Sequence, residues 1–259
     1  MVEDGRLEEA LQATKAAHFD AGGGACDYSA LAASREHGRL AACLAGLASF
    51  DPKRVRIPAQ TAFWLNVFNA VVLRDAAELA LAAGMREVQD FFERARLKLG
   101  GFEYSLDDIE HGLLRGNVPK FGRLRPPMSR DDPRLAYMPL AYDERMHFAM
   151  HCASRSSPPF RVFEGGKLDL QLEQATADYL RRNVRVEKEG ALVVLPCQFR
   201  WYPDDFGGEQ GCLEFALGQL DEEIVDLVDR RRGRVKLRYA EFDWTLNQRA
   251  RILPNRSPP

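Results

Sequence analysis

The sequence has no long apolar run, no excess of charge of one sign and no paired cysteines. No stretch reaches the roughly 18 apolar residues that span a bilayer. The 36 Lys and Arg residues balance 38 Asp and Glu residues, which excludes a generally basic nucleic-acid-binding protein. The five cysteines are scattered, which argues against a disulfide framework. The N-terminus lacks the basic start and apolar core of a signal peptide, and we expect a cytoplasmic protein that binds neither membrane nor nucleic acid.

The chain has enough apolar residues for a large core. Of its 259 residues, 46% are hydrophobic and 29% are charged, the balance of a water-soluble globular protein. Residues 6–19 and 28–48 have the pattern of amphipathic helices, separated by a glycine-rich segment, 21–24, that we interpret as a flexible joint. We expect residues 1–50 to form a helical lead packed on one domain that spans residues 51–259.

The segment 61–83 combines good helix formers with apolar residues on nearly every side, which predicts a buried helix. Asn66 and Asn69 are three residues apart and therefore lie on one side of it. A buried amide without hydrogen bonds costs about 1 to 3 kcal/mol. Both amides therefore need partners from elsewhere in the chain.

A further helix is predicted to begin at Ser105. The hydroxyl can cap the free amides while the carboxylate of Asp108 reaches back to the chain at Ser105. At 100° per residue, Glu110 falls within the apolar arc of this helix and His111 lies at the edge of the arc. An acid and an imidazole are thus expected side by side at the core. The proline-rich stretch 115–139 that follows predicts a long irregular loop.

The remaining segments predict a helix and short strands. Residues 146–152 fit either a strand or a short helix capped by Asp143, and both periods place His147 and His151 on one side. Residues 167–180 predict an amphipathic helix. Residues 184–186 and 192–195 predict a hairpin, and residues 235–239 predict a half-buried strand. The predicted fold class is α+β, a mainly helical domain with a small antiparallel sheet.

Several blocks of the sequence are recognisable together. The three strongest are residues 63–70 (FWLNVFNA), 105–115 (SLDDIEHGLLR) and 143–159 (DERMHFAMHCASRSSPP), and weaker ones are 168–172 (LDLQL), 201–206 (WYPDDF) and 243–247 (DWTLN). In this order they resemble the successive blocks of the family catalogued as domain of unknown function 547 (DUF547). The resemblance covers roughly residues 60–250.

The resemblance implies little about activity. The architecture of the family is distantly similar to that of papain-like and transglutaminase-like thiol enzymes. Two departures from the family pattern matter. Ser157 stands where bacterial members often carry a second Cys, which argues against a mechanism with two neighbouring thiols. Arg74 stands where many members carry a His, which argues against a role for that His in this chain.

Cys152 is the candidate nucleophile, because it lies within the third strong block. A nucleophilic thiol needs an imidazole or a positive charge to lower its pKa, and usually a third group to orient the imidazole. We assign the base to His111 and its orientation to Glu110 or to one of the two Asn side chains, with Asp205 as a further option. All five histidines precede Cys152, so the base comes before the nucleophile, a permuted order relative to papain-like enzymes. Binding roles are assigned to Asn66, Asn69, Arg145, His147 and Ser154.

Each assignment has a structural alternative. A free cysteine is often simply a buried apolar group. The carboxylate of Glu110 could have a purely structural role, in a buried ion pair with Arg145. Buried packing is also the favoured explanation for the tryptophans within the family blocks, Trp64, Trp201 and Trp244.

No metal or other cofactor is expected. His147, His151 and Cys152 have the spacing of zinc ligands on one side of an element, but a fourth donor is lacking. The adjacent glycines at residues 22–24 and 207–208 lack the preceding strand and following helix of a phosphate-binding loop.

Two functions are compatible with these patterns. The first is a thiol-dependent hydrolase or acyl transferase that acts on amide or thioester bonds of a peptide or small-molecule substrate through Cys152 and His111. The second is a non-catalytic binding or scaffold module for a protein partner, whose polar cluster is purely structural.

Overall fold

The computed structural model describes residues 3–79, 90–187, 189–231 and 233–249. Its helices are α1 (Glu3–His18), α2 (Tyr28–Ala32), α3 (Arg35–Gly46), α4 (Gln60–Glu78), α5 (Phe91–Arg94), the π-helix η5 (Asp108–Leu114), α6 (Leu168–Asn183), α7 (Gln198–Trp201), α8 (Gly208–Leu217) and α9 (Glu222–Asp229). Its strands are β1 (Arg96–Leu99), β2 (Phe102–Ser105), β3 (Arg185–Glu187), β4 (Leu192–Leu195) and β5 (Lys236–Tyr239). Short 3-10 helices include η7 (Glu144–Phe148) and η9 (Pro203–Phe206).

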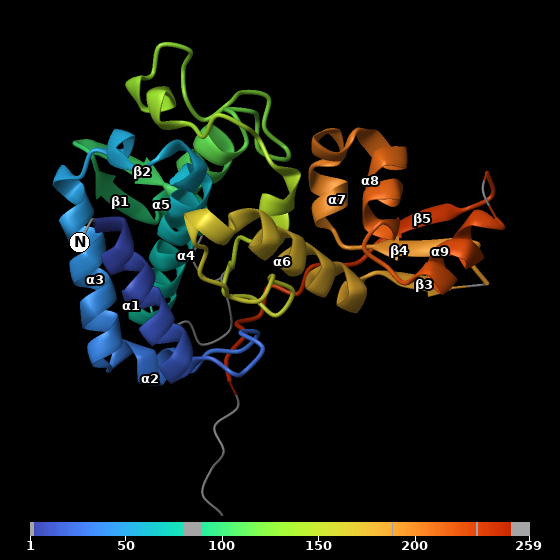
Figure 1. Ribbon diagram of the computed structural model, residues 1–259, viewed down its shortest axis with the longest axis horizontal. Helices are drawn as coiled ribbons and strands as arrows, with labels where there is room; N and C mark the ends of the chain where they lie inside the picture. The colour runs from blue at the N-terminus through green and yellow to red at the C-terminus, as the bar shows by residue number, and fades with distance from the viewer. Residues whose placement is uncertain (1–2, 80–89, 188, 232, 250–259) are drawn as a thin grey trace, which may run out of the picture.

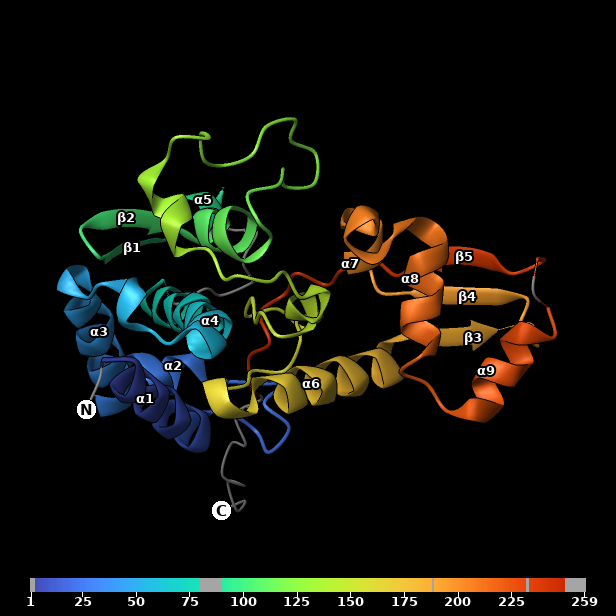
Figure 2. The same ribbon diagram turned by 45° about the horizontal axis from the view of Figure 1, so that its top comes forward.

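These elements form two groups, each with its own hydrophobic cluster. The first group contains α1–α5 with β1 and β2, and the second contains α7–α9 with β3–β5 (Figures 1 and 2). Helix α6 runs from one group to the other, and after β5 the chain returns to the first group. No helix among the described residues is long and apolar enough to cross a membrane. The α+β, mainly helical fold class is confirmed.

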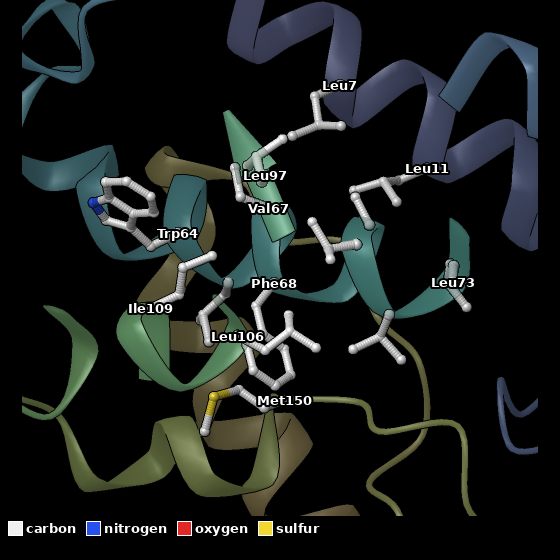
Figure 3. Packing of buried hydrophobic residues seen from close by; sticks show 14 of the residues in the cluster. Leu7, Leu11, Trp64, Val67, Phe68, Leu73, Leu97, Leu106, Ile109 and Met150 are labelled. Atoms are coloured by element: carbon white, nitrogen blue, oxygen red, sulfur yellow. The ribbon is translucent and has the colours of Figure 1, made fainter. Parts of the chain in front are cut away.

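Helix α4 forms the centre of the first cluster. It is buried on all sides between residues 62 and 73, as the apolar pattern predicts, but it ends at Glu78, earlier than expected; residues 80–83 lie outside the described residues. Figure 3 shows its side chains surrounded by α1, β1 and the π-helix: Trp64, Val67, Phe68 and Leu73 lie among Leu7, Leu11, Leu97, Leu106 and Ile109. Helix α1 contributes apolar residues at helical spacing, Leu7, Ala10 and Leu11, and is therefore part of this core.

The two amides of α4 do find distant partners. Asn66 donates to the carbonyl of Phe163 (2.7 Å) and accepts from its amide (2.9 Å). Asn69 accepts from the amide of His151 (2.8 Å) and donates to the carbonyl of Ala149 (3.3 Å). Each amide thus binds a main-chain segment that would otherwise have unpaired buried groups, and α4 holds the chain on both sides of residues 152–160.

The β1–β2 hairpin is absent from the elements expected above. Its two-residue turn, Gly100 and Gly101, has φ of 59° and 82°, which glycine adopts without strain. The strands pair antiparallel from Arg96 opposite Ser105 to Leu99 opposite Phe102.

The second sheet corrects the expectation of a purely antiparallel arrangement. Strands β3 and β4 form the predicted hairpin, with Arg185 opposite Val194, whereas the turn residue 188 lies outside the described residues. Strand β5 pairs parallel to β4 on its other side. The physical reason is the connection: α7, α8 and α9 lie between β4 and β5 in the chain, and a long helical crossover returns a strand in the same direction.

Two helix predictions also need correction. The expected helix 28–48 is divided, because Ser34 leaves the helical conformation and its hydroxyl accepts the amide hydrogen of His37 to cap α3. In residues 146–152 the short helix is correct and the strand is wrong: Asp143 caps η7, which ends at Phe148. His147 and His151 therefore do not share a side as the regular periods predicted.

The glycine-rich segment 21–24 packs closely against the backbone at Phe160 and is not a flexible joint. Gly23 has φ of 70°, and its carbonyl accepts from the amide of Phe160 (2.8 Å). A Cβ on Gly23 would lie 2.6 Å from the carbonyl oxygen of Phe160. Asp20 accepts from the amides of Gly24 and Ala25, which orders the turn further. Sequence shows the freedom of glycine but not the backbone that approaches it.

We predict that Gly23→Ala destabilises the protein by at least about 2 kcal/mol, since strain at a positive φ alone costs about 1 to 3 kcal/mol and the added methyl also meets backbone. Gly22→Ala is the matched control, because a Cβ there meets only the carboxylate of Asp20 at an ordinary 3.7 Å. Urea unfolding of the two variants measures the difference. Equal effects of both substitutions would contradict the close contact.

Candidate functional site

A cavity of about 100 Å³ lies between the first hydrophobic cluster, which contributes Phe68 and Met150, and α7 with the residue after it, which contribute Gln198, Trp201 and Tyr202. Four residues singled out in the sequence line it, Glu110, His111, His147 and Cys152, and they come from the π-helix, from η7 and from the segment after η7. The other lining residues are Phe68, Phe92, Asp107, Lys120, Met150, Pro158, Gln198, Trp201, Tyr202, Phe242 and Trp244. The cavity therefore combines ionisable groups with mostly apolar walls.

The walls are largely aromatic. Trp201 stacks on Trp244 with ring centroids 5.9 Å apart, and Phe242 lies 4.4 Å from Trp244 and 5.2 Å from Trp201. Phe92 contacts Trp244 edge-on at 6.3 Å. The interpretation of Trp201 and Trp244 as buried packing therefore needs correction, since both are only partly buried and face the cavity, whereas Trp64 is fully buried as expected.

The π-helix brings Glu110 and His111 to the cavity together. The expected capping box is present: the amide of Asp108 donates to the Ser105 hydroxyl (3.0 Å), and the amide of Ser105 donates to the Asp108 carboxylate (2.9 Å). Beyond the cap, however, the helix widens from α to π geometry, and the amide of Arg115 donates to the carbonyl of Glu110 five residues earlier (2.8 Å). Such widened turns are frequent at functional sites.

His111 is buried and held in its neutral form. Burial lowers its pKa well below 6.5, and the guanidinium of Arg115 lowers it further. Arg115 Nη1 donates to His111 Nδ1 (3.1 Å), and since a guanidinium only donates, Nδ1 must be the acceptor. The ring hydrogen of the neutral imidazole is therefore on Nε2. This nitrogen is buried without a hydrogen-bond partner among the described residues and lies 3.8 Å from Asp107 Oδ1.

Glu110 has a carboxyl group that titrates near neutrality. Burial raises its pKa to about 7, and the nearby carboxylate of Asp107 adds to this, while Arg115 and Lys120 oppose it. Its side chain is 15% exposed. The ion pair with Arg145 that we considered is wrong, because Arg145 instead binds Asp143 (2.7 Å) and Asp169 (2.8 Å).

His147 belongs to a second buried network. Its Nε2 lies 2.7 Å from Oδ2 of Asp205. The same carboxylate accepts a hydrogen bond from Arg115 on each oxygen, 2.7 Å at Oδ2 and 2.8 Å at Oδ1. Burial pushes the pKa of Asp205 upward, but the hydrogen bonds from His147 and Arg115 outweigh burial and hold it well below its usual range. The imidazole stacks on the ring of Tyr202 at 4.8 Å, so it is fixed both by the carboxylate and by the stacking.

Cys152 sits in a constrained turn. Its Sγ lies 3.3 Å from Ser154 Oγ, and its amide donates to Ser157 Oγ (2.8 Å). The next residue, Ala153, has φ of 57°, a left-handed conformation that costs a non-glycine residue about 1 to 3 kcal/mol. Burial raises the pKa of the Cys152 thiol, and the hydrogen bonds from the two serines only partly offset it. The resting thiol is therefore neutral at pH 7.

The C-terminal segment holds this turn. The amide of Asn247 donates to the carbonyl of Ala153 (3.1 Å), and the amide of Arg155 donates to the carbonyl of Thr245 (2.9 Å). The Asn247 side chain in turn accepts from Tyr28 (2.7 Å). Segments of the chain that lie far apart in sequence thus fix the residues on the C-terminal side of Cys152.

The remaining sequence-predicted residues are not at the cavity. Asn66 and Asn69 support the main chain behind it, and Arg145 points toward α6. His151 is fully buried, with Nδ1 2.8 Å from the carbonyl of Pro158. Among the described residues no three His, Cys, Asp or Glu side chains are placed to hold a metal ion together.

Sequence reasoning missed Arg115, Asp107, Lys120 and Tyr202. Arg115 has a signal that a sequence can carry, because it follows Glu110 and His111 within one or two turns of the same helix. The other three become relevant only through tertiary contacts: Lys120 binds Asp107 (2.7 Å) from the irregular loop, and Tyr202 lies under the guanidinium of Arg115 (4.1 Å).

We predict that Glu110→Gln stabilises the protein more at pH 8 than at pH 5. The folded pKa of about 7 lies above the ordinary 4.5, so the carboxyl contributes stability that is fully present below about pH 4.5 and is lost as the pH rises through 7. A permanently neutral amide avoids this loss, which amounts to about 3 kcal/mol. Urea unfolding at the two pH values, with the exposed Glu241→Gln as the control, measures the effect. A Glu110→Gln effect that does not change with pH would contradict the raised pKa.

Comparison with known proteins identifies the family. The family model described as "Protein of unknown function, DUF547" matches residues 52–180. The matched range contains Glu110, His111, His147 and Cys152. It ends before four aromatic residues that also line the cavity, Trp201, Tyr202, Phe242 and Trp244. No curated protein and no solved structure matched the chain. From the family blocks and the model match together, the chain is a DUF547 domain-containing protein.

Proposed function

We propose that the cavity is the active site of a thiol-dependent hydrolase or acyl transferase that acts on thioester or amide bonds. One observation carries this proposal: Cys152, Glu110 and His111, which are separated by some forty residues in the chain, line one small cavity. The left-handed Ala153 beside the thiol supports it, because strain of this kind persists where the surroundings enforce it and is concentrated at functional sites.

Glu110 serves as the general base. The thiol of Cys152 is neutral at rest, so its proton must leave as the sulfur attacks the acyl carbon. A carboxylate with a pKa of about 7 is half ionised at neutral pH, which suits it both to accept that proton and to return it to the leaving thiol or amine. Burial is the main cause of the raised pKa of the Cys152 thiol, and the negative charge of Glu110 adds to it. Water or a second acceptor then attacks the acyl-enzyme and releases Cys152 as the thiol.

In this mechanism His111 acts as a hydrogen-bond donor, and the role of general base, which the sequence pattern suggests for it, belongs to Glu110. Burial keeps the imidazole neutral, and Arg115 adds to this by its charge and occupies Nδ1 with a hydrogen bond, so the ring cannot readily accept a second proton. Its Nε2–H, which has no partner among the described residues, can instead stabilise the negative charge that develops on the carbonyl oxygen of the substrate. A donor that is already buried and oriented needs no reorganisation in the transition state.

The walls limit the substrate. A cavity of about 100 Å³ with aromatic walls accepts a short apolar group, since a cavity of roughly 150 Å³ holds a benzene ring. His147 keeps a binding role: Asp205 and Tyr202 fix it, and it forms a rigid polar part of the wall. Short-chain acyl groups are therefore the expected acyl part of the substrate.

We predict that S-butyryl-N-acetylcysteamine, a model thioester, or p-nitrophenyl butyrate acylates Cys152. Intact-mass measurement and peptide mapping should locate one butyryl group there, and Cys152→Ser should abolish turnover by the thiol route. Glu110→Gln should lower the rate about 10²- to 10⁴-fold. The wild-type rate should rise with pH through about 7 as Glu110 loses its proton.

Cys43→Ser is the matched control, because Cys43 is partly exposed but lies outside the cavity. Circular dichroism and thermal melting of each variant separate loss of activity from loss of folding. Acylation that persists in Cys152→Ser, or that maps to Cys43, would contradict the proposal. A folded protein that is never acylated would favour the alternative, a binding or scaffold module, with which the neutral resting thiol is also compatible.

A further inference from the structure

A second and larger cavity adjoins the first. It measures about 560 Å³ and shares Asp107, His111 and Lys120 with the first cavity. Its other lining residues are Glu93, Arg96, Ser105, Asp108, Gly122, Arg123, Leu124, Arg125 and Pro127. The loop after the π-helix thus forms one side of it, and β1 with the start of the π-helix forms the other. His111 lies at the junction of the two cavities.

The charges around the second cavity are unequal. Each of its carboxylates already has a cation: Asp107 binds Lys120 (2.7 Å), Glu93 binds Arg123 (2.8 Å), and Asp108 binds Arg134 (3.0 Å). Two cations are left over.

The two remaining cations are Arg96 and Arg125. Arg96 lies 3.9 Å from Asp108, a carboxylate that already binds Arg134 more closely. Arg125 makes no hydrogen bond or ion pair with any described residue. Their guanidinium groups present several donors in a planar arrangement, which matches the oxygens of a carboxylate or a phosphate.

His111 connects the two cavities, because its side chain lines both of them. Its buried Nε2–H, which has no partner among the described residues, is the donor proposed for the carbonyl oxygen of the substrate. A group bound in the second cavity would therefore lie beside the reacting bond. An anion here would therefore neutralise surplus positive charge on one side and lie near the reacting group on the other.

We propose that the second cavity binds an anionic group, a carboxylate or a phosphate, of the same substrate whose short acyl group enters the first cavity. The binding of an anion follows from the arginines themselves, and only its assignment to the substrate rests on the proposed function. The substrate class is then a thioester or amide of a short acyl group that carries a negatively charged portion a few atoms from the reacting bond.

The binding of the anion can be tested without catalysis. Inorganic phosphate and succinate are titrated calorimetrically into the Cys152→Ala protein at constant ionic strength, and the tighter of the two identifies the preferred anion. The double variant Arg96→Gln/Arg125→Gln should raise the Kd at least tenfold. Arg185→Gln/Arg238→Gln is the matched control, since it removes the same charge from exposed positions on β3 and β5, and it should leave the Kd unchanged. If neither anion binds, or if the double variants behave alike, the proposal is overturned.

The link to the substrate is tested with two butyrate esters of similar size, neutral p-nitrophenyl butyrate and anionic 4-(butyryloxy)benzoate, whose charge lies on the leaving group. The Arg96→Gln/Arg125→Gln variant, with Cys152 intact, should lower kcat/KM for the anionic ester about tenfold and leave that for the neutral ester unchanged. Equal loss for both esters would overturn the link. Because the calorimetric test uses a protein without the thiol, failure of the thiol mechanism and failure of the anion site give different results.

Discussion

The buried ion pair between Arg115 and Asp205 is the interaction on which the arrangement of the site depends. Arg115 directly follows the π-helix of the first group, and Asp205 precedes Phe206 of the second hydrophobic cluster. Two hydrogen bonds of 2.7 and 2.8 Å join them, and the side chain of Arg115 is 5% exposed. A third nitrogen contact reaches the carbonyl of Pro119 at the start of the long loop (3.1 Å). One guanidinium thus positions the helix, the loop and the second cluster relative to one another.

The same ion pair sets the protonation states around the cavity. Its hydrogen bonds keep Asp205 ionised although the carboxylate is partly buried, whereas burial keeps His111 neutral and the charge of Arg115 adds to that effect. Glu110 receives no direct hydrogen bond from a cation among the described residues, and its pKa therefore moves to about 7 rather than falling as that of Asp205 does. The surroundings thus raise the pKa of Glu110 and lower that of Asp205. Opposite shifts of this kind distinguish a group suited to acid–base chemistry from a structural carboxylate.

The sequence predicts the parts of this structure that depend on local pattern. The all-round apolar stretch of α4, the cap at Ser105 and the β3–β4 hairpin are each visible within a few residues. The need for partners at Asn66 and Asn69 is also visible, because a buried amide must be satisfied, but the identity of the partners some eighty to a hundred residues away is not.

The predictions that the structure corrects fail for one physical reason, because each depends on a contact between segments far apart in the chain. Gly23 differs from a flexible joint only because the backbone of Phe160 approaches it. Trp201 and Trp244 differ from core residues only because the chain returns after β5 and brings them together at an opening. The pairing of Arg115 with Asp205 spans ninety residues and leaves no local periodicity. Glu110 and His111 were selected from their place on the apolar face of a helix, and Cys152 from its place in a family block. All three line one cavity, whereas Arg145, which was given a binding role, contacts Asp169 of α6 instead.

Two local distortions adjoin the proposed reacting groups, and the tertiary structure maintains both. The π-helix exchanges regular α geometry for a wider turn at Glu110 and His111, and Ala153 adopts a left-handed conformation beside Cys152. Arg115 holds the end of the first, and the C-terminal segment holds the second through Asn247. That segment also carries Trp244 of the cavity wall. The same stretch of chain therefore supports the turn that carries the thiol and contributes a wall of the cavity that the thiol lines.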